Sequence, residues 1–168
     1  MSLFGLDLAQ KGLSLYTIPA AFMLAMAPHA YASTSSGKTY DLAYPRKLQT
    51  TIVSDDKVDK VVSLPGSMPQ SATKARILRG EAAAANAFET LGFFSAAVVA
   101  ANTAGVDPRS VNLLSLGYIG CRILYNIIYV RLQDNRSWAP VRSLVWIASI
   151  GAVFTLYFKA AAQLAASS

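Results

Sequence analysis

The sequence predicts an all-α integral membrane protein that folds as a four-helix bundle in one domain, residues 1–168. The chain is 54% hydrophobic and 14% charged, whereas a soluble domain typically holds about a quarter charged residues. Four apolar segments approach the ~20 residues that a helix needs to cross a bilayer. The basic residues behind the net charge of +6 gather beside these segments, which favours the lipid bilayer over nucleic acid as partner.

The first apolar segment, residues 12–32, has two interpretations. Lys11 precedes it and Ala30-Tyr31-Ala32 resembles a cleavage site, which together are typical of a signal peptide. However, Asp7 lies in the region that a signal peptide would keep basic, and the later apolar segments need a hydrophobic partner. We therefore expect a membrane helix, with a cleaved signal as the alternative.

Residues 33–75 are expected to form a long polar loop. The serines and threonine of 33–36 and the run 54–57 are typical of solvated loop. Pro65, Gly66 and Pro69 should keep regular structure short there. The sequence indicates no site in this segment.

Three further membrane helices are expected at residues 76–101, 111–131 and 140–162. The run Ala82–Ala85 would allow a neighbouring helix to approach closely. Residues 102–110 should form a tight polar turn. Pro140 falls in the first turn of the last helix, where a proline is tolerated.

The distribution of Lys and Arg predicts the orientation of the bundle. Ten basic residues lie in the loops after the first and third segments, and three lie on the other side. We therefore expect both loops in the cytosol and both termini in the lumen. The ten are Lys38, Arg46, Lys47, Lys57, Lys60, Lys74, Arg76, Arg79, Arg131 and Arg136; the three are Lys11, Arg109 and Lys159.

Ionisable side chains interrupt the last three apolar segments. Glu89, Arg122 and Arg142 are costly in hydrocarbon, so they should face a protein interior or a wet cavity. An ion pair between Glu89 and Arg122 would offset part of that cost. The alternative is an ion pair that only holds the bundle together.

The polar residues are predicted to form a pocket open to the cytosol. Asn86 lies one turn from Glu89, and Tyr125 and Tyr129 extend from Arg122 along one helix face. Arg142, Ser143 and Trp146 should reach the same mouth from the fourth helix. The tyrosines could instead serve packing alone, and Trp138 and Trp146 could be interface anchors. His29 and Cys121 are each the only one of their kind, so no metal site and no intrachain disulfide is expected.

These motifs resemble the MAPEG family, the membrane-associated proteins of eicosanoid and glutathione metabolism. The resemblance rests on Arg79, on Asn86-Ala87-Phe88-Glu89, on Arg122-Ile123-Leu124-Tyr125 with Tyr129, and on Ala139-Pro140-Val141-Arg142-Ser143. It implies a homotrimer in the endoplasmic reticulum membrane that binds glutathione between subunits near the cytosolic face. It also implies a lipophilic substrate.

The resemblance assigns roles by position. Arg79, Asn86, Glu89, Arg122, Tyr125 and Tyr129 would bind glutathione. Arg142 would stabilise its thiolate, and Ser143 would contact the sulfur. The leading expectation is thus a glutathione transferase or peroxidase.

Two departures from the family pattern keep other functions open. Ala82 stands where glutathione-using members carry an arginine that grips the tripeptide, and Trp146 replaces a tyrosine of some members. One alternative is a MAPEG-fold enzyme that does not use glutathione, such as an isomerase-like tailoring enzyme. The other is a non-catalytic membrane subunit.

Overall fold

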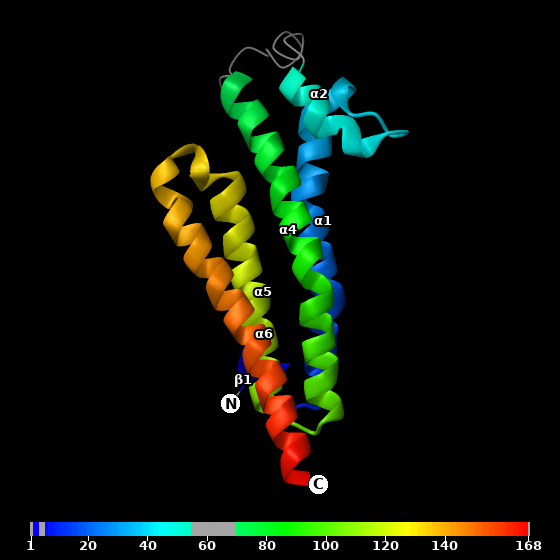
Figure 1. Ribbon diagram of the computed structural model, residues 1–168, viewed down its shortest axis with the longest axis vertical. Helices are drawn as coiled ribbons and strands as arrows, with labels where there is room; N and C mark the ends of the chain where they lie inside the picture. The colour runs from blue at the N-terminus through cyan, green and yellow to red at the C-terminus, as the bar shows by residue number, and fades with distance from the viewer. Residues whose placement is uncertain (1, 4–5, 55–69, 168) are drawn as a thin grey trace.

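Four long helices form the protein in a computed structural model that describes residues 2–3, 6–54 and 70–167 (Figure 1). They are α1 (Thr17–Ser36), α4 (Gln70–Thr103), α5 (Pro108–Val130) and α6 (Ala139–Ser167). The shorter elements are β1 (Ser2–Leu3), β2 (Leu6–Asp7), α2 (Leu48–Ser54) and 3-10 turns at Leu13–Tyr16, Gly37–Thr39, Pro45–Lys47, Leu132–Asp134 and Arg136–Trp138. β1 and β2 pair antiparallel.

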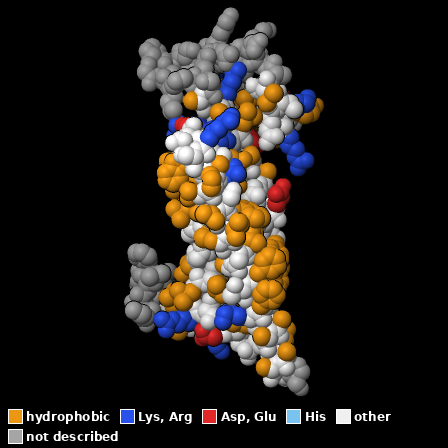
Figure 2. Space-filling view, turned by 60° about the vertical axis from the view of Figure 1, so that its left-hand side comes forward, with side chains coloured by type: hydrophobic (Ala, Val, Ile, Leu, Met, Phe, Trp, Pro, Cys, Tyr) orange, Lys and Arg blue, Asp and Glu red, His pale blue; other side chains and the backbone are white. Residues whose placement is uncertain are grey.

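All four long helices have the length and composition needed to cross a membrane. A broad band of hydrophobic side chains covers the middle of the face in Figure 2, and Lys and Arg side chains gather near both ends. Figure 1 places both termini at one end of the bundle, and α2 and the α5–α6 turn at the other. The predicted grouping of the two basic loops at one end is therefore confirmed, and the chain is a multi-pass membrane protein.

Helices α1 and α4 extend beyond the predicted bounds at the loop end, whereas α1 begins at Thr17, after its predicted start at residue 12. Residues 33–36, expected in the loop, form the last turn of α1 because their hydroxyls bond back to the helix: Thr34 donates to the Ala30 carbonyl at 2.8 Å and Ser36 to the Ser33 carbonyl at 2.8 Å. The 33–75 loop also contains α2, whose Leu48 and Ile52 pack on Ala32 of α1 and Ile77 of α4. The run 55–57 and the predicted breakers Pro65, Gly66 and Pro69 lie outside the described residues.

Helix α1 packs into the bundle, with buried residues along its length that include Ala21, Ala25 and Ala32. Its contact with α4 is tight at Gly80, where an added β-carbon would lie 2.9 Å from the Pro28 carbonyl oxygen. Only a residue without a side chain fits there. The segment expected at 12–32 is thus a bundle helix that needs α4 for its packing.

Pro28 lies inside α1 and leaves the Leu24 carbonyl without its usual helical donor, because proline has no N–H. The Asn126 side chain of α5 donates to this carbonyl at 3.0 Å. The same proline that interrupts one helix thereby creates an attachment point for another.

Two buried features hold the terminal end together. Phe94 of α4 stacks on Tyr118 of α5 with ring centroids 3.8 Å apart, and both residues are almost fully buried. Asn112, also buried, donates to the carbonyls of Leu8 and Gln10 at 2.8 and 2.9 Å, while its oxygen accepts the Ser14 backbone N–H at 2.8 Å. This side chain thereby ties the N-terminal segment to α5.

The turn between α4 and α5 is shorter than predicted. Gly105 adopts a left-handed conformation with φ of 74°, which glycine accommodates without strain. Asp107 caps α5, accepting the Ser110 backbone N–H at 2.9 Å, and Pro108 occupies the first turn. Hydrogen bonds from the backbone and the side chain of Ser110 hold the pKa of Asp107 below its ordinary value.

Candidate functional site

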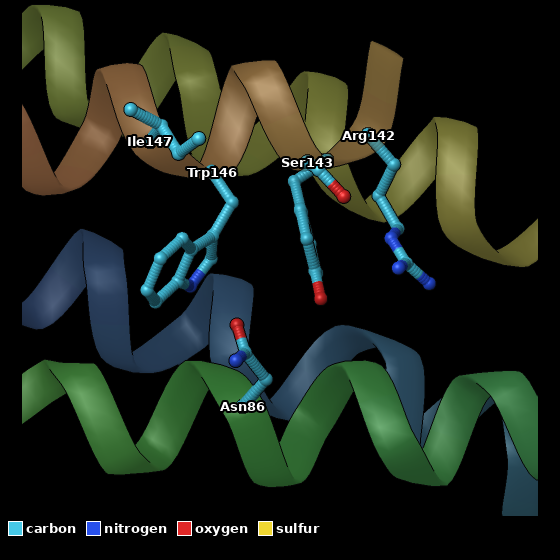
Figure 3. Close-up of a pocket in the computed structure, with 6 residues that line it drawn as sticks. Asn86, Arg142, Ser143, Trp146 and Ile147 are labelled. Carbon is cyan, nitrogen blue, oxygen red and sulfur yellow. The ribbon is translucent and has the colours of Figure 1, made fainter. Parts of the chain in front are cut away.

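A cavity of about 350 Å³ lies between α4, α5 and α6 near the loop end of the bundle. Figure 3 shows Asn86 of α4 pointing across the gap toward Arg142, Ser143 and Trp146 of α6. The residues that line the cavity are Asn86, Tyr125, Arg142, Ser143, Trp146 and Ile147. The structure therefore brings together several of the side chains that the sequence predicted in one pocket, and Ile147 is an addition.

Arg142 lies at this cavity with its charge uncompensated by an acid. Its guanidinium stacks over the Tyr129 ring, 4.5 Å from the centroid, and donates to the Gln133 side-chain oxygen at 3.2 Å. Among the described residues no carboxylate lies within ion-pair distance of it. Tyr125 and Tyr129 contact edge to face at 5.5 Å. The cavity thus combines a cation with aromatic walls.

The predicted Glu89–Arg122 ion pair is wrong in this structure. Arg122 is 3% exposed and donates to the Asn86 side-chain oxygen at 3.1 Å, and its charge lies 4.7 Å from the Tyr125 ring centroid. Glu89 is exposed on the surface of α4. Helical spacing placed both residues in facing segments, but it did not fix how far α4 is rotated about its axis.

Arg122 contacts two of the residues that line the cavity, Asn86 and Tyr125. Its Nη2 is buried and finds no hydrogen-bond partner among the described residues, and the same is true of the Trp146 Nε1. Buried donors of this kind normally have partners. The Ser143 hydroxyl donates a hydrogen bond within its own helix, to the Ala139 carbonyl at 3.2 Å. The Trp146 Nε1 is therefore a donor without a partner among the described residues, on a side chain that lines the cavity.

Arg79 is not at this cavity. Together with Arg76 it binds Asp134 beyond the end of α5, and it approaches the Val130 carbonyl at 3.4 Å. The two arginines therefore satisfy the carboxylate and the C-terminus of α5. The seven-residue spacing puts Arg79 and Asn86 on one helix face, but they lie two turns apart and contact different groups.

A second polar cluster was not predicted from the sequence. His29 of α1 contacts Glu81 of α4, with Nδ1 2.9 Å from the carboxylate, in a separate cavity of about 650 Å³. The two residues are 52 positions apart, and neither belongs to a local motif. Only the packing of α1 against α4 brings them together.

Comparison with known proteins gives one match. No curated protein and no solved structure matches the sequence. The model of the MAPEG family matches residues 15–162, nearly the whole chain, including the first helix. With four apolar helices, and with several of its motif residues around one cavity, the chain belongs to the MAPEG family.

Proposed function

We propose that this protein is a membrane-bound glutathione transferase or peroxidase that acts on a lipophilic substrate. The observation that carries the proposal is the position of Arg142 and Ser143 of α6 opposite Asn86 and Tyr125 around one cavity. The cavity is polar enough for a thiol compound such as glutathione because its lining includes an amide, a phenol and a guanidinium. Its aromatic walls and Ile147 suit an apolar reactant.

The chemistry requires a thiolate. A free thiol is mostly protonated near neutral pH, and a neighbouring cation favours the anionic form, which is the nucleophile. Arg142 has no described acid to neutralise it, so its charge is available to the sulfur. The thiolate forms a carbon–sulfur bond with an electrophilic carbon, the leaving group departs with the bonding electrons, and the thiol proton passes to solvent.

The proposed glutathione contacts are Asn86, Glu89, Tyr125 and Tyr129. Arg122 would hold Asn86 and Tyr125 in place. Glu89 is exposed in the middle of an apolar helix, where contact with lipid would be costly. A neighbouring subunit that covers α4 would remove this cost. This supports a homotrimer with a site completed between subunits, which we propose together with residence in the endoplasmic reticulum membrane.

The alternative, a MAPEG-fold protein that does not use glutathione, is favoured by two other observations. Ala82 provides no charge where an arginine would grip a carboxylate, and Arg79 is already bound to Asp134. An unpaired carboxylate in such a site is costly. This alternative includes an isomerase-like enzyme and a non-catalytic subunit. Turnover of an electrophile or of an isomerisable lipid would indicate the enzyme, and its absence the subunit.

Titration of the purified protein with glutathione tests the proposal. Binding to the folded state raises the melting temperature as ligand increases. The ultraviolet absorbance of the bound thiolate should appear at lower pH in the wild type than in Arg142→Ala, with Arg142→Lys between them. Turnover in Arg142→Ala should fall at least tenfold, about 1.4 kcal/mol of barrier. Unchanged melting across the titration would leave only the alternative.

A further inference from the structure

The second cavity is independent of the site described above. Its wall on α4 consists of Glu81, Ala84, Ala85 and Phe88, which at spacings of three and four residues form one helix face. Asn86 lies on a different face, and the two cavities share no lining residue. The remaining lining residues come from α1, from the segment that leads into α2 and from α2 itself: Met26, His29, Tyr40, Pro45, Arg46 and Gln49.

The polar end of this cavity is built around His29. Its Nδ1 lies 2.9 Å from Glu81, and the side chains of the two residues are 27% and 13% exposed. A carboxylate accepts hydrogen bonds, so Nδ1 is the donor toward Glu81, and in the ring with a single proton Nε2 is an acceptor. Tyr40 is the neighbour of Nε2, with its hydroxyl 3.4 Å away. That distance makes a weak hydrogen bond, which a better donor can replace.

The other end of the cavity is apolar, and it is formed by helices that can cross the membrane. Met26 and Phe88 are 36% and 40% exposed, and both belong to helices that can cross the membrane. Phe22 continues this wall along α1 through an edge-to-face contact with Phe88 at 5.8 Å. A lipophilic molecule therefore meets an apolar surface that leads from the membrane to Nε2 of His29.

We propose that this cavity binds a neutral lipophilic alcohol or phenol whose hydroxyl donates to Nε2 of His29. The volume of about 650 Å³ suits a small organic molecule. The Glu81 carboxylate beside His29 disfavours an anionic head, because like charges repel in a partly buried site. Arg46 at the rim disfavours a cationic one. A neutral hydroxyl satisfies the acceptor without either cost.

Three probes of one shape test the proposal on the detergent-solubilised full chain, with empty micelles as the partition blank. They are 2-naphthol, 2-methoxynaphthalene, which lacks the donor, and 2-naphthoate, which is anionic. We expect 2-naphthol to bind about tenfold more tightly than the ether, the order that one hydrogen bond provides. Equal affinities, or tighter binding of 2-naphthoate, would overturn the proposal.

Substitution then assigns the preference to His29. His29→Leu removes the acceptor and should bring the two neutral probes to the same affinity, while Ala30→Leu, an exposed neighbour outside the cavity lining, should keep the preference for 2-naphthol. Persistence of the preference in a folded His29→Leu protein would refute the assignment. If His29→Leu does not fold, Tyr40→Phe replaces it. Tyr40→Phe frees Nε2, so it should retain the preference or enlarge it, and loss of the preference would count against the proposal.

Discussion

Replacement of Asn112 by leucine should be among the most destabilising single changes in the chain. The two side chains are similar in size, so the change mainly removes hydrogen bonds. Asn112 is 1% exposed and serves three backbone groups: the Ser14 N–H and the carbonyls of Leu8 and Gln10. A buried group that loses its partner costs about 1–3 kcal/mol.

The Ser14 and Leu8 groups carry most of this cost. Both of these hydrogen bonds are buried, whereas the one to Gln10 is only partly buried and its carbonyl can turn to water. Two stranded groups give a loss of roughly 2–6 kcal/mol. For a chain of this length a loss of about 3 kcal/mol lowers the melting temperature by roughly 6–12 °C.

The single cysteine provides the assay. Cys121 is partly buried in α5, and a thiol-reactive fluorescent dye should label it faster as the bundle opens on heating. Leu113→Ala, at an exposed position next to Asn112 on the same helix, is the control and should melt close to the wild type. An Asn112→Leu protein that melts with the wild type would show that the N-terminal segment does not depend on this side chain.

Three further predictions concern helix contacts. Gly80→Ala should destabilise the bundle by about 1–3 kcal/mol, because its β-carbon would lie 2.9 Å from the Pro28 carbonyl; the melting temperature reports this, with Gly92→Ala, where nothing lies within 4 Å, as the control. Asn126→Ala should cost about 1–3 kcal/mol by stranding the Leu24 carbonyl, and Pro28→Ala in the same chain should recover part of the loss by restoring the helical donor; no recovery would disprove the link. Because the pKa of Asp107 is lowered in the folded state, its cap stabilises the fold at pH values above the ordinary pKa of about 3.8. This stabilisation is lost as the pH falls through the lower folded-state pKa. The fall in melting temperature below pH 3.8 should therefore be smaller in Asp107→Ser, which caps the helix without titrating.

The four membrane helices could be predicted from the sequence because membrane thickness imposes a length and composition that can be counted. Their ends were less predictable. Thr34 and Ser36 are typical of loops, yet they continue α1 because their hydroxyls bond to carbonyls one turn back. Such bonds depend on a helix that already exists, so composition alone does not reveal them.

The candidate site was predicted in part for a similar reason. Motif spacing brought Asn86, Tyr125, Arg142 and Ser143 to one cavity, because each lies on a helix whose face the spacing defines. It did not give the partner of Arg122, which depends on the rotation of α4. Nor did it reveal the His29–Glu81 contact, which depends on how closely Gly80 lets two helices approach.

The length of α4 has a consequence for how molecules reach the cavity. Its 34 residues extend about 50 Å at ~1.5 Å per residue, whereas the hydrocarbon core is about 30 Å thick. With Thr103 at the far boundary, Asn86 lies ~26 Å along the helix, only a few ångströms inside the near boundary. In the proposed reaction, a water-soluble reactant would therefore enter from the loop end without crossing lipid, while an apolar one would diffuse in from the bilayer. The proposed transferase would therefore combine a reactant from water with one from the membrane, and its rate with an apolar substrate should follow the concentration of that substrate in the membrane rather than in the surrounding water.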